Sequence, residues 1–130
     1  MENLELMGTK GVPTVRFNVE TGLIELIGQS YQDLAVKYFD TLSQQLDEYI
    51  SQIKKPITFN FKLTYFNSSA SKRILNLLIK LNEYKDNDGD VTVNWHFDEE
   101  DLDMEELVND YTQMSGIQIN LIPDSEMQWE

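Results

Sequence analysis

The fold is decided by residues 57–84, ITFNFKLTYFNSSASKRILNLLIKLNEY, in which a strand pattern gives way to a helix pattern. From Ile57 to Tyr65 every second residue is apolar, which predicts a strand with one face toward the core. Apolar residues then recur at helical spacing, at Ala70, Ile74, Leu77, Leu78, Leu81 and Tyr84. The stretch therefore predicts a strand and an amphipathic helix that meet at residues 65–71.

The rest of the chain shows the same two kinds of pattern. The other predicted elements are strands at 15–19, 23–27, 91–97 and 117–121, and helices at 34–53 and 98–116. Ser30 and Asp33 have the spacing of a capping box and are expected to open the first of these helices. In the last helix, the residues expected to face inward are Leu102, Leu107, Tyr111 and Met114.

This order, β-β-α-β-α-β-α-β, indicates an α/β fold with a mixed sheet. The later strands alternate apolar with polar residues, so one face of the sheet is expected to meet water. We therefore predict a two-layer sandwich: five strands in the order 1-2-3-4-5, with all three helices mainly on one face. The first strand is expected to be antiparallel and at an edge. One domain is predicted for residues 1–130, with 1–11 and 123–130 peripheral.

Composition excludes several classes of function. The chain has a formal net charge of −13 and a pI of about 4.3, which argues against a nucleic-acid binder and favours protein partners. It has no cysteine, and residues 1–11 lack the apolar core of a signal peptide. No stretch is apolar enough for a membrane helix, so a cytoplasmic protein is predicted. We find no pattern typical of catalytic residues, a metal site or a cofactor site, and we expect no enzyme.

The junction at residues 65–71 is the candidate functional site. It places the hydroxyls of Ser68, Ser69 and Ser71 at a helix start, where backbone N–H groups lack intrahelical partners. Such a place suits a helix cap, an anion or a covalent phosphate. The helical phase predicts that Ser71 faces inward and that Ser69 shares the polar stripe with Arg73.

Ser68 lies on a different stripe of the same helix. It is in line with Lys72, Leu75 and Ile79, at the border between core and solvent. Leu75 and Ile79 are therefore expected to be apolar residues at or near the surface, where a partner protein can dock.

Short motifs along nearly the whole chain resemble the SiaC family of bacterial regulatory phosphoproteins, which is related in architecture to STAS-type anti-sigma-factor antagonists. The most specific is Tyr65-Phe66-Asn67-Ser68-Ser69 at the junction. The others are Gly8-Thr9, Gly28-Gln29-Ser30-Tyr31 and Trp95-His96. In place of the family's proline-glutamate pair after Ser-Tyr, this chain has Gln32-Asp33.

The resemblance implies a partner-switch role. A cognate serine/threonine kinase phosphorylates the residue after the junction asparagine, and a PP2C-like phosphatase removes the phosphate. The unphosphorylated form binds and activates a signalling partner such as a diguanylate cyclase, which raises cyclic di-GMP and promotes biofilm formation. The acceptor maps to Ser68, where the family pattern has threonine, and Ser69 is the second choice.

Other residues take supporting roles in this interpretation. Asn67, Ser69, Ser71 and Lys72 are expected to support the phosphorylation site, and Leu75, Ile79 and Tyr31 are candidates for partner contact. One alternative is a constitutive protein-interaction scaffold in which the serines act only as a helix cap. Another is a small-molecule binder that uses the polar sheet face around Asn60, Asn94 and His96.

Overall fold

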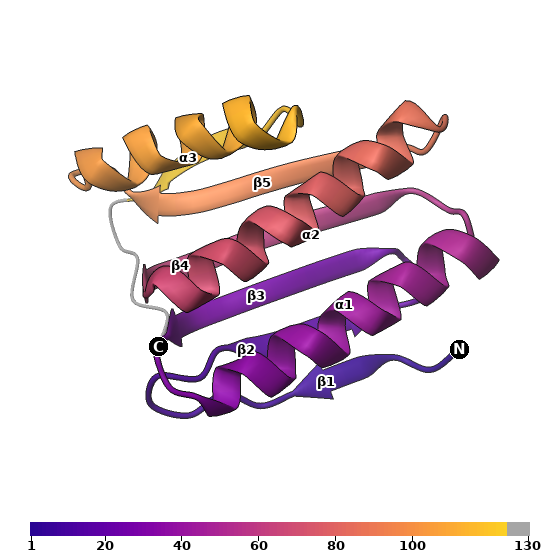
Figure 1. The fold of residues 1–130 in the computed structure, drawn as a ribbon, viewed down its shortest axis with the longest axis horizontal. Coiled ribbons are helices and arrows are strands. Elements are labelled where there is room, and N and C mark those ends of the chain that lie inside the picture. The colour runs from indigo at the N-terminus through magenta and orange to yellow at the C-terminus, as the bar shows by residue number, and fades with distance from the viewer. Residues whose placement is uncertain (125–130) are drawn as a thin grey trace.

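The computed structural model describes residues 1–124. Within them the strands are β1 (Leu4–Leu6), β2 (Thr14–Asn18), β3 (Leu23–Ser30), β4 (Ile57–Phe66), β5 (Val91–Asp98) and β6 (Asn120–Asp124). The helices are α1 (Leu34–Gln52), α2 (Ser68–Asp86) and α3 (Leu102–Ser115). All three helices lie against the same face of the sheet, with α1 over its N-terminal strands (Figure 1).

The strands form one sheet in the order β1-β2-β3-β4-β5-β6. β1, β2 and β3 pair antiparallel, whereas β3, β4, β5 and β6 pair parallel because each is joined to the next through a helix. The sheet has six strands rather than the predicted five, because residues 4–6 pair with β2 and take the edge position. The prediction that residues 15–19 form the edge was therefore wrong. Three residues are too few to show an alternation in sequence.

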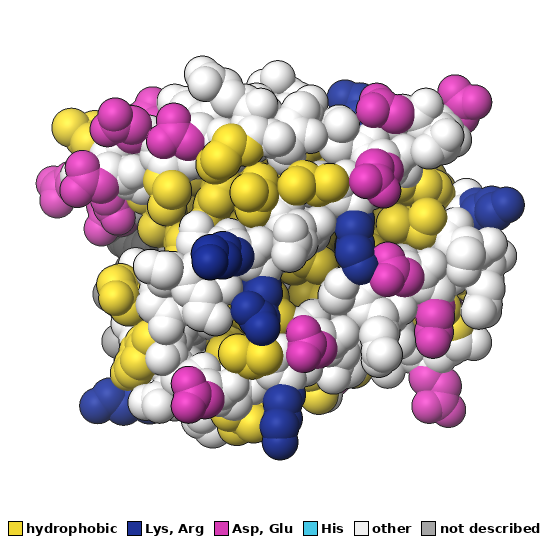
Figure 2. Space-filling view, viewed as in Figure 1, with side chains coloured by type: hydrophobic (Ala, Val, Ile, Leu, Met, Phe, Trp, Pro, Cys, Tyr) yellow, Lys and Arg dark blue, Asp and Glu magenta, His cyan; other side chains and the backbone are white. Residues whose placement is uncertain are grey.

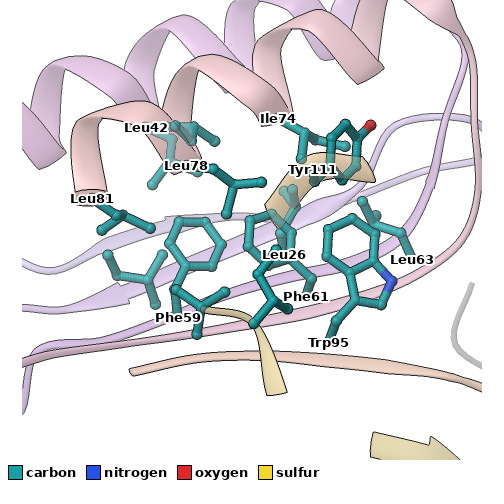
Figure 3. Packing of buried hydrophobic residues seen from close by; sticks show 14 of the residues in the cluster. Leu26, Leu42, Phe59, Phe61, Leu63, Ile74, Leu78, Leu81, Trp95 and Tyr111 are labelled. Carbon is teal, nitrogen blue, oxygen red and sulfur yellow. The ribbon is translucent and has the colours of Figure 1, made fainter. Parts of the chain in front are cut away.

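The core lies between the sheet and the helices. Phe59, Phe61 and Trp95 are stacked in neighbouring positions, with ring centroids 4.3 Å apart for the phenylalanines and 4.6 Å for Phe61 and Trp95 (Figure 3). Tyr111 from α3 packs on Trp95 with centroids 5.8 Å apart. These aromatic side chains are fully buried and fix the distance between the layers.

α1 and α2 cover this core with amphipathic faces. Leu42 and Leu46 of α1 and Leu78 of α2 are fully buried. The two helices are joined at the surface by Lys80, whose Nζ lies 2.8 Å from an Asp47 oxygen. No helix in the described part of the chain combines the length and apolar character needed to cross a membrane.

The opposite face of the sheet has no helix over it. Asn60, Asn94 and Asn120 form a ladder there: Asn94 donates to Asn60 at 2.9 Å, and Asn120 donates to Asn94 at 3.1 Å. His96 lies on the same face, and its pKa is lowered mainly by partial burial and then by the charge of Lys62. This face is polar and internally hydrogen-bonded.

The end of β4 differs from its predicted pattern. The register between β3 and β4 shifts between Gly28 and Gln29, so that Gly28 pairs with Leu63 and Gln29 with Tyr65. The extra residue reverses the alternation beyond it. Tyr65, predicted to face inward, is 54% exposed, and Phe66 instead packs on Trp95.

The predicted capping box at the start of α1 is also wrong. Residues 28–30 continue β3, and Ser30 is buried within the sheet opposite Phe66. The helix begins at Leu34, and the side chain of Asp33 makes no capping hydrogen bond. Pairing with β4 holds residues 28–30 in the strand, which the local sequence does not reveal.

α3 begins later than predicted. Residue 98 still belongs to β5, and the Asp101 carboxylate accepts from the Met104 N–H as the helix cap. The inward residues are Met104, Val108, Tyr111 and Ser115, whereas Leu102 and Met114 are 70% and 56% exposed. Residues 117 and 119 are buried before the last strand, which starts at Asn120 and includes Pro123. The tail predicted from residue 123 onward was wrong for Pro123 and Asp124, which belong to this strand, and its remainder, from residue 125, lies outside the described residues.

We expect Phe61→Ala to lower the free energy of unfolding by about 3–5 kcal/mol, because it removes the central ring of the stack and leaves a cavity. Thr92→Ala, on the uncovered face of β5, is the control and should change it by less than about 0.5 kcal/mol. Urea denaturation measures both. Equal losses for the two variants would contradict this account of the core.

Candidate functional site

The junction between β4 and α2 lies at the carboxyl end of the parallel strands. β4 ends at Phe66 and α2 begins at Ser68, so Asn67 alone connects the two elements. The loop after β3 reaches the same end of the sheet. This is the edge where open α/β sheets place their ligands.

Asn67 makes three hydrogen bonds that define the junction. Its Oδ1 accepts from the Ala70 N–H at 3.0 Å, which caps α2. Its Nδ2 donates to the Tyr31 carbonyl at 3.3 Å, and its backbone N–H donates to the Ser30 carbonyl at 3.0 Å. The helix cap is thus Asn67, so the prediction that the serines supply the cap was wrong, whereas the scaffold interpretation itself stays a prediction.

The three serines have different environments. Ser68 and Ser69 are exposed, and Arg73 Nη1 donates to Ser69 Oγ at 3.3 Å. Ser71 is half-buried, and its Oγ lies 2.5 Å from the hydroxyl oxygen of Tyr111. Only Ser68 and Ser69 present hydroxyls that a modifying enzyme can reach.

The Ser71–Tyr111 contact connects the junction to α3. Tyr111 is buried, and burial raises the pKa of its hydroxyl, while the hydrogen bond with Ser71 acts in the opposite direction as the smaller cause. The tyrosine therefore stays neutral at physiological pH. The contact between Ser71 and Tyr111 ties the first turn of α2 to α3.

Tyr31 is held at the junction by backbone contacts. The N–H groups of Tyr31 and Gln32 both donate to the Gly11 carbonyl, at 2.9 and 3.0 Å. Gly11 has a φ of 79°, and a Cβ there would meet the Tyr31 ring at 2.8 Å, so glycine is required. The Tyr31 and Tyr65 rings form an edge-to-face pair with centroids 6.0 Å apart. Three segments distant in sequence thus meet around Asn67.

The other predicted residues are distributed along α2. Lys72 is exposed one turn after Ser68. Leu75 and Ile79 are half-buried about two and three turns from the helix start. Figure 2 shows hydrophobic side chains gathered between α2 and α3 on this face of the molecule. Tyr31 therefore belongs to the junction itself, whereas Leu75 and Ile79 lie further along the helix.

Sequence reasoning missed two aromatic residues of this region. It placed Tyr65 inward, and only the register shift between β3 and β4 exposes this side chain. It assigned Tyr111 to the core without its hydrogen bond to Ser71. No local signal in the sequence reveals either feature, because both depend on segments far apart along the chain.

The comparison with protein families decides the identity of the chain. The family model described as SiaC family regulatory phosphoprotein matches residues 6–124. The chain belongs to the SiaC family. It is 22% identical over 111 residues to an uncharacterised protein of Pseudomonas aeruginosa (strain UCBPP-PA14), a match that spans 85% of this chain and 88% of the relative.

Solved structures of SiaC have the same fold. Apo-SiaC from P. aeruginosa superposes with a TM-score of 0.86 at 20% identity, covering 94% of this chain and 99% of that one. SiaC in the crystal structure of the diguanylate cyclase SiaD in complex with its activator SiaC gives a TM-score of 0.88 at 20% identity, covering 93% and 99%. At 20% sequence identity, this structural similarity shows that the chains share a fold.

We expect Asn67→Ala to lower the free energy of unfolding by about 1–2 kcal/mol, because the variant loses the cap of α2 and the hydrogen bond to Tyr31. Asn67→Asp retains the acceptor for the Ala70 N–H and should recover most of this loss. Chemical denaturation measures the series. If Asn67→Asp is as unstable as Asn67→Ala, the cap is not the stabilising contact.

Ser71→Ala should cost about 1–3 kcal/mol, because it leaves the buried Tyr111 hydroxyl without its partner. Tyr111→Phe in the same chain removes that unpaired group, so the double variant should be more stable than Ser71→Ala alone. A double-mutant cycle in urea gives the coupling energy. Purely additive effects would show that the contact contributes nothing.

Proposed function

We propose that this SiaC-family chain is a phosphorylation-controlled partner-switch protein. Its unphosphorylated form binds and activates a signalling partner such as a diguanylate cyclase. A cognate serine/threonine kinase phosphorylates Ser68 and releases the partner, and a PP2C-like phosphatase restores the binding form. The protein itself acts by binding rather than catalysis, in the cytoplasm.

The observation that carries this proposal is the position of Ser68. It is the first residue of α2, its side chain is exposed, and it directly follows the asparagine that caps the helix. The family description as a regulatory phosphoprotein calls for an accessible acceptor. Ser71 does not qualify, because its hydroxyl is engaged with Tyr111.

The fold tolerates a phosphate at this position. Phosphorylation adds about −1.5 to −2 charges, and the positive end of a helix dipole favours negative charge by about 0.3–1 kcal/mol. Lys72 lies one turn further along the same stripe and adds positive charge. The modified chain stays folded, so the phosphate acts on partner binding rather than on the stability of the domain.

A partner that covers the start of α2 responds to this change. A surface that has buried the neutral hydroxyl meets a doubly charged group instead, and desolvating that group is costly. Leu75 and Ile79 on α2 and Tyr31 at the junction offer apolar contact area nearby. SiaD, the partner named for the related SiaC, is a diguanylate cyclase, which supports that class of partner here.

Binding to the diguanylate cyclase of the same organism, measured by calorimetry, tests the proposal. Ser68→Asp should weaken binding at least about tenfold, a change of about 1.4 kcal/mol, whereas Ser68→Ala should bind as tightly as the unmodified protein. Gln44→Glu adds one negative charge at an exposed position of α1 and is the matched control. After incubation with the kinase, the intact mass of Ser68→Ala should show one phosphoryl group fewer than that of the protein with Ser68.

Two results would contradict the proposal. Equal cyclase affinity for Ser68→Asp and Ser68→Ala would remove the switch and leave a constitutive interaction scaffold. A mass gain of the same size in Ser68→Ala as in the protein with Ser68 would move the acceptor to another residue.

A further inference from the structure

A small cavity lies beside the junction, between the starts of α1 and α2. Its volume is about 30 Å³. The polar residues that line it are Ser30, Gln32, Asp33, Asn67, Ser69 and Arg73. Ser69 lines this cavity, whereas Ser68 does not, so the two exposed serines at the start of α2 have different neighbours.

Two buried polar atoms in the lining are unsatisfied. Ser30 is 1% exposed, and its Oγ has no hydrogen-bond partner within residues 1–124. The same holds for Nε of Arg73, although the rest of that side chain reaches the Ser69 hydroxyl. Buried polar groups are normally hydrogen-bonded, so we expect a further group, either an ordered water or a ligand, to reach these atoms.

The groups that surround the cavity are mainly donors. A guanidinium Nε–H is only a donor, and a serine hydroxyl can donate. At the start of α2, the Asn67 N–H and the Ala70 N–H are satisfied by Ser30 and by the Asn67 side chain. The N–H of Ser69, by contrast, belongs to the first turn, where backbone N–H groups have no intrahelical acceptor. Converging donors at a helix N-terminus fit an oxyanion.

The size of the cavity decides which oxyanion fits. The cavity is small: about 30 Å³ is a few times the roughly 10–15 Å³ that a single enclosed water needs, so it has room for an oxygen or two of an oxyanion. An oxyanion attached at the rim can place one oxygen in it, and the hydroxyl at the rim is that of Ser69. We propose that Ser69 is a second phosphorylation site, whose phosphoryl group is received by Arg73, the Ser30 hydroxyl and the free N–H of the first turn.

The proposal rests on the proposed function only in requiring a kinase that acts at the start of α2. Transfer forms a bond between Ser69 Oγ and the γ-phosphorus of a nucleoside triphosphate. The bond from that phosphorus to its bridging oxygen breaks, nucleoside diphosphate leaves, and the hydroxyl proton passes to a base of the kinase.

A phosphate on Ser69 has a different effect from one on Ser68. Arg73, one turn along the helix, pairs with it, and the hydrogen bond to Ser30 links α2 to the end of β3. Basic side chains lie over the first turns of α2 (Figure 2). The Ser69 phosphate is thus held within the molecule, whereas the Ser68 phosphate faces a partner. Among residues 1–124, Asp33 is the carboxylate that lines the cavity, and it opposes the charge.

The test uses the full chain with phosphoserine incorporated during translation at residue 69 or at residue 68, so no kinase is needed. Phosphorus NMR follows the second ionisation of each phosphate, whose ordinary pKa is about 6. At residue 69 this pKa should fall by about one unit, because Arg73 and the donors favour the dianion. Arg73→Gln should abolish most of the shift, whereas Lys72→Gln, an exposed neighbour outside the lining, should retain it.

Two further variants separate a bound phosphate from general charge effects. Ser30→Ala should leave the thermal midpoint of the unmodified protein unchanged or raised, because its hydroxyl is unpaired there. In the protein phosphorylated at residue 69, the same substitution should reduce the pKa shift. Asp33→Asn should enlarge the shift, because it removes a carboxylate from the lining.

Three results would overturn the proposal that Ser69 is a second phosphorylation site. A phosphate at residue 69 with an unshifted pKa, or with a shift that survives Arg73→Gln, means that the cavity holds water and not a phosphate oxygen. A rise in the thermal midpoint of unmodified protein with inorganic phosphate, lost in Arg73→Gln, assigns the cavity to a free anion instead. None of these results touches the Ser68 switch, whose test is cyclase affinity.

Discussion

Asn67 holds the functional region together, because its three hydrogen bonds connect the end of β3, the loop at Tyr31 and the first turn of α2. A side chain that both accepts and donates is needed for this, and asparagine is among the best helix caps. The consequence is a strand-to-helix junction with a fixed conformation. Ser68 and Ser69 follow directly, so their positions in space are set by this one residue.

The junction is also connected to the more distant parts of the fold. The hydrogen bond between Ser71 and Tyr111 reaches α3, and Tyr111 packs in turn on the central Trp95. On the other side, the register shift in β4 turns Tyr65 outward to pair with Tyr31. The exposed Ser68 and Ser69 therefore lie in a segment that these contacts hold in place. A charge added there, as in the proposed switch, would have a defined position.

The serines at the start of α2 are adjacent in sequence but not equivalent. Ser68 projects from the helix in line with Lys72, away from the cavity, whereas Ser69 borders the cavity that contains the buried Ser30 hydroxyl and Arg73. Successive residues on a helix are turned by about 100° from one another, so neighbouring hydroxyls face different surroundings. This difference in surroundings underlies the two separate proposals for Ser68 and Ser69.

The sequence by itself determined the α/β class, the amphipathic faces of α1 and α2, the inward Ser71 and the family, because periodicity and short motifs are local properties. Tertiary structure decided the remainder. The edge strand β1, the exposure of Tyr65 and the strand conformation of Ser30 all follow from pairing between strands. The cavity at Arg73 exists only because the starts of α1 and α2 meet. Hydrogen bonds and packing between distant segments produce no periodic pattern in the amino-acid sequence, so the sequence alone does not predict them.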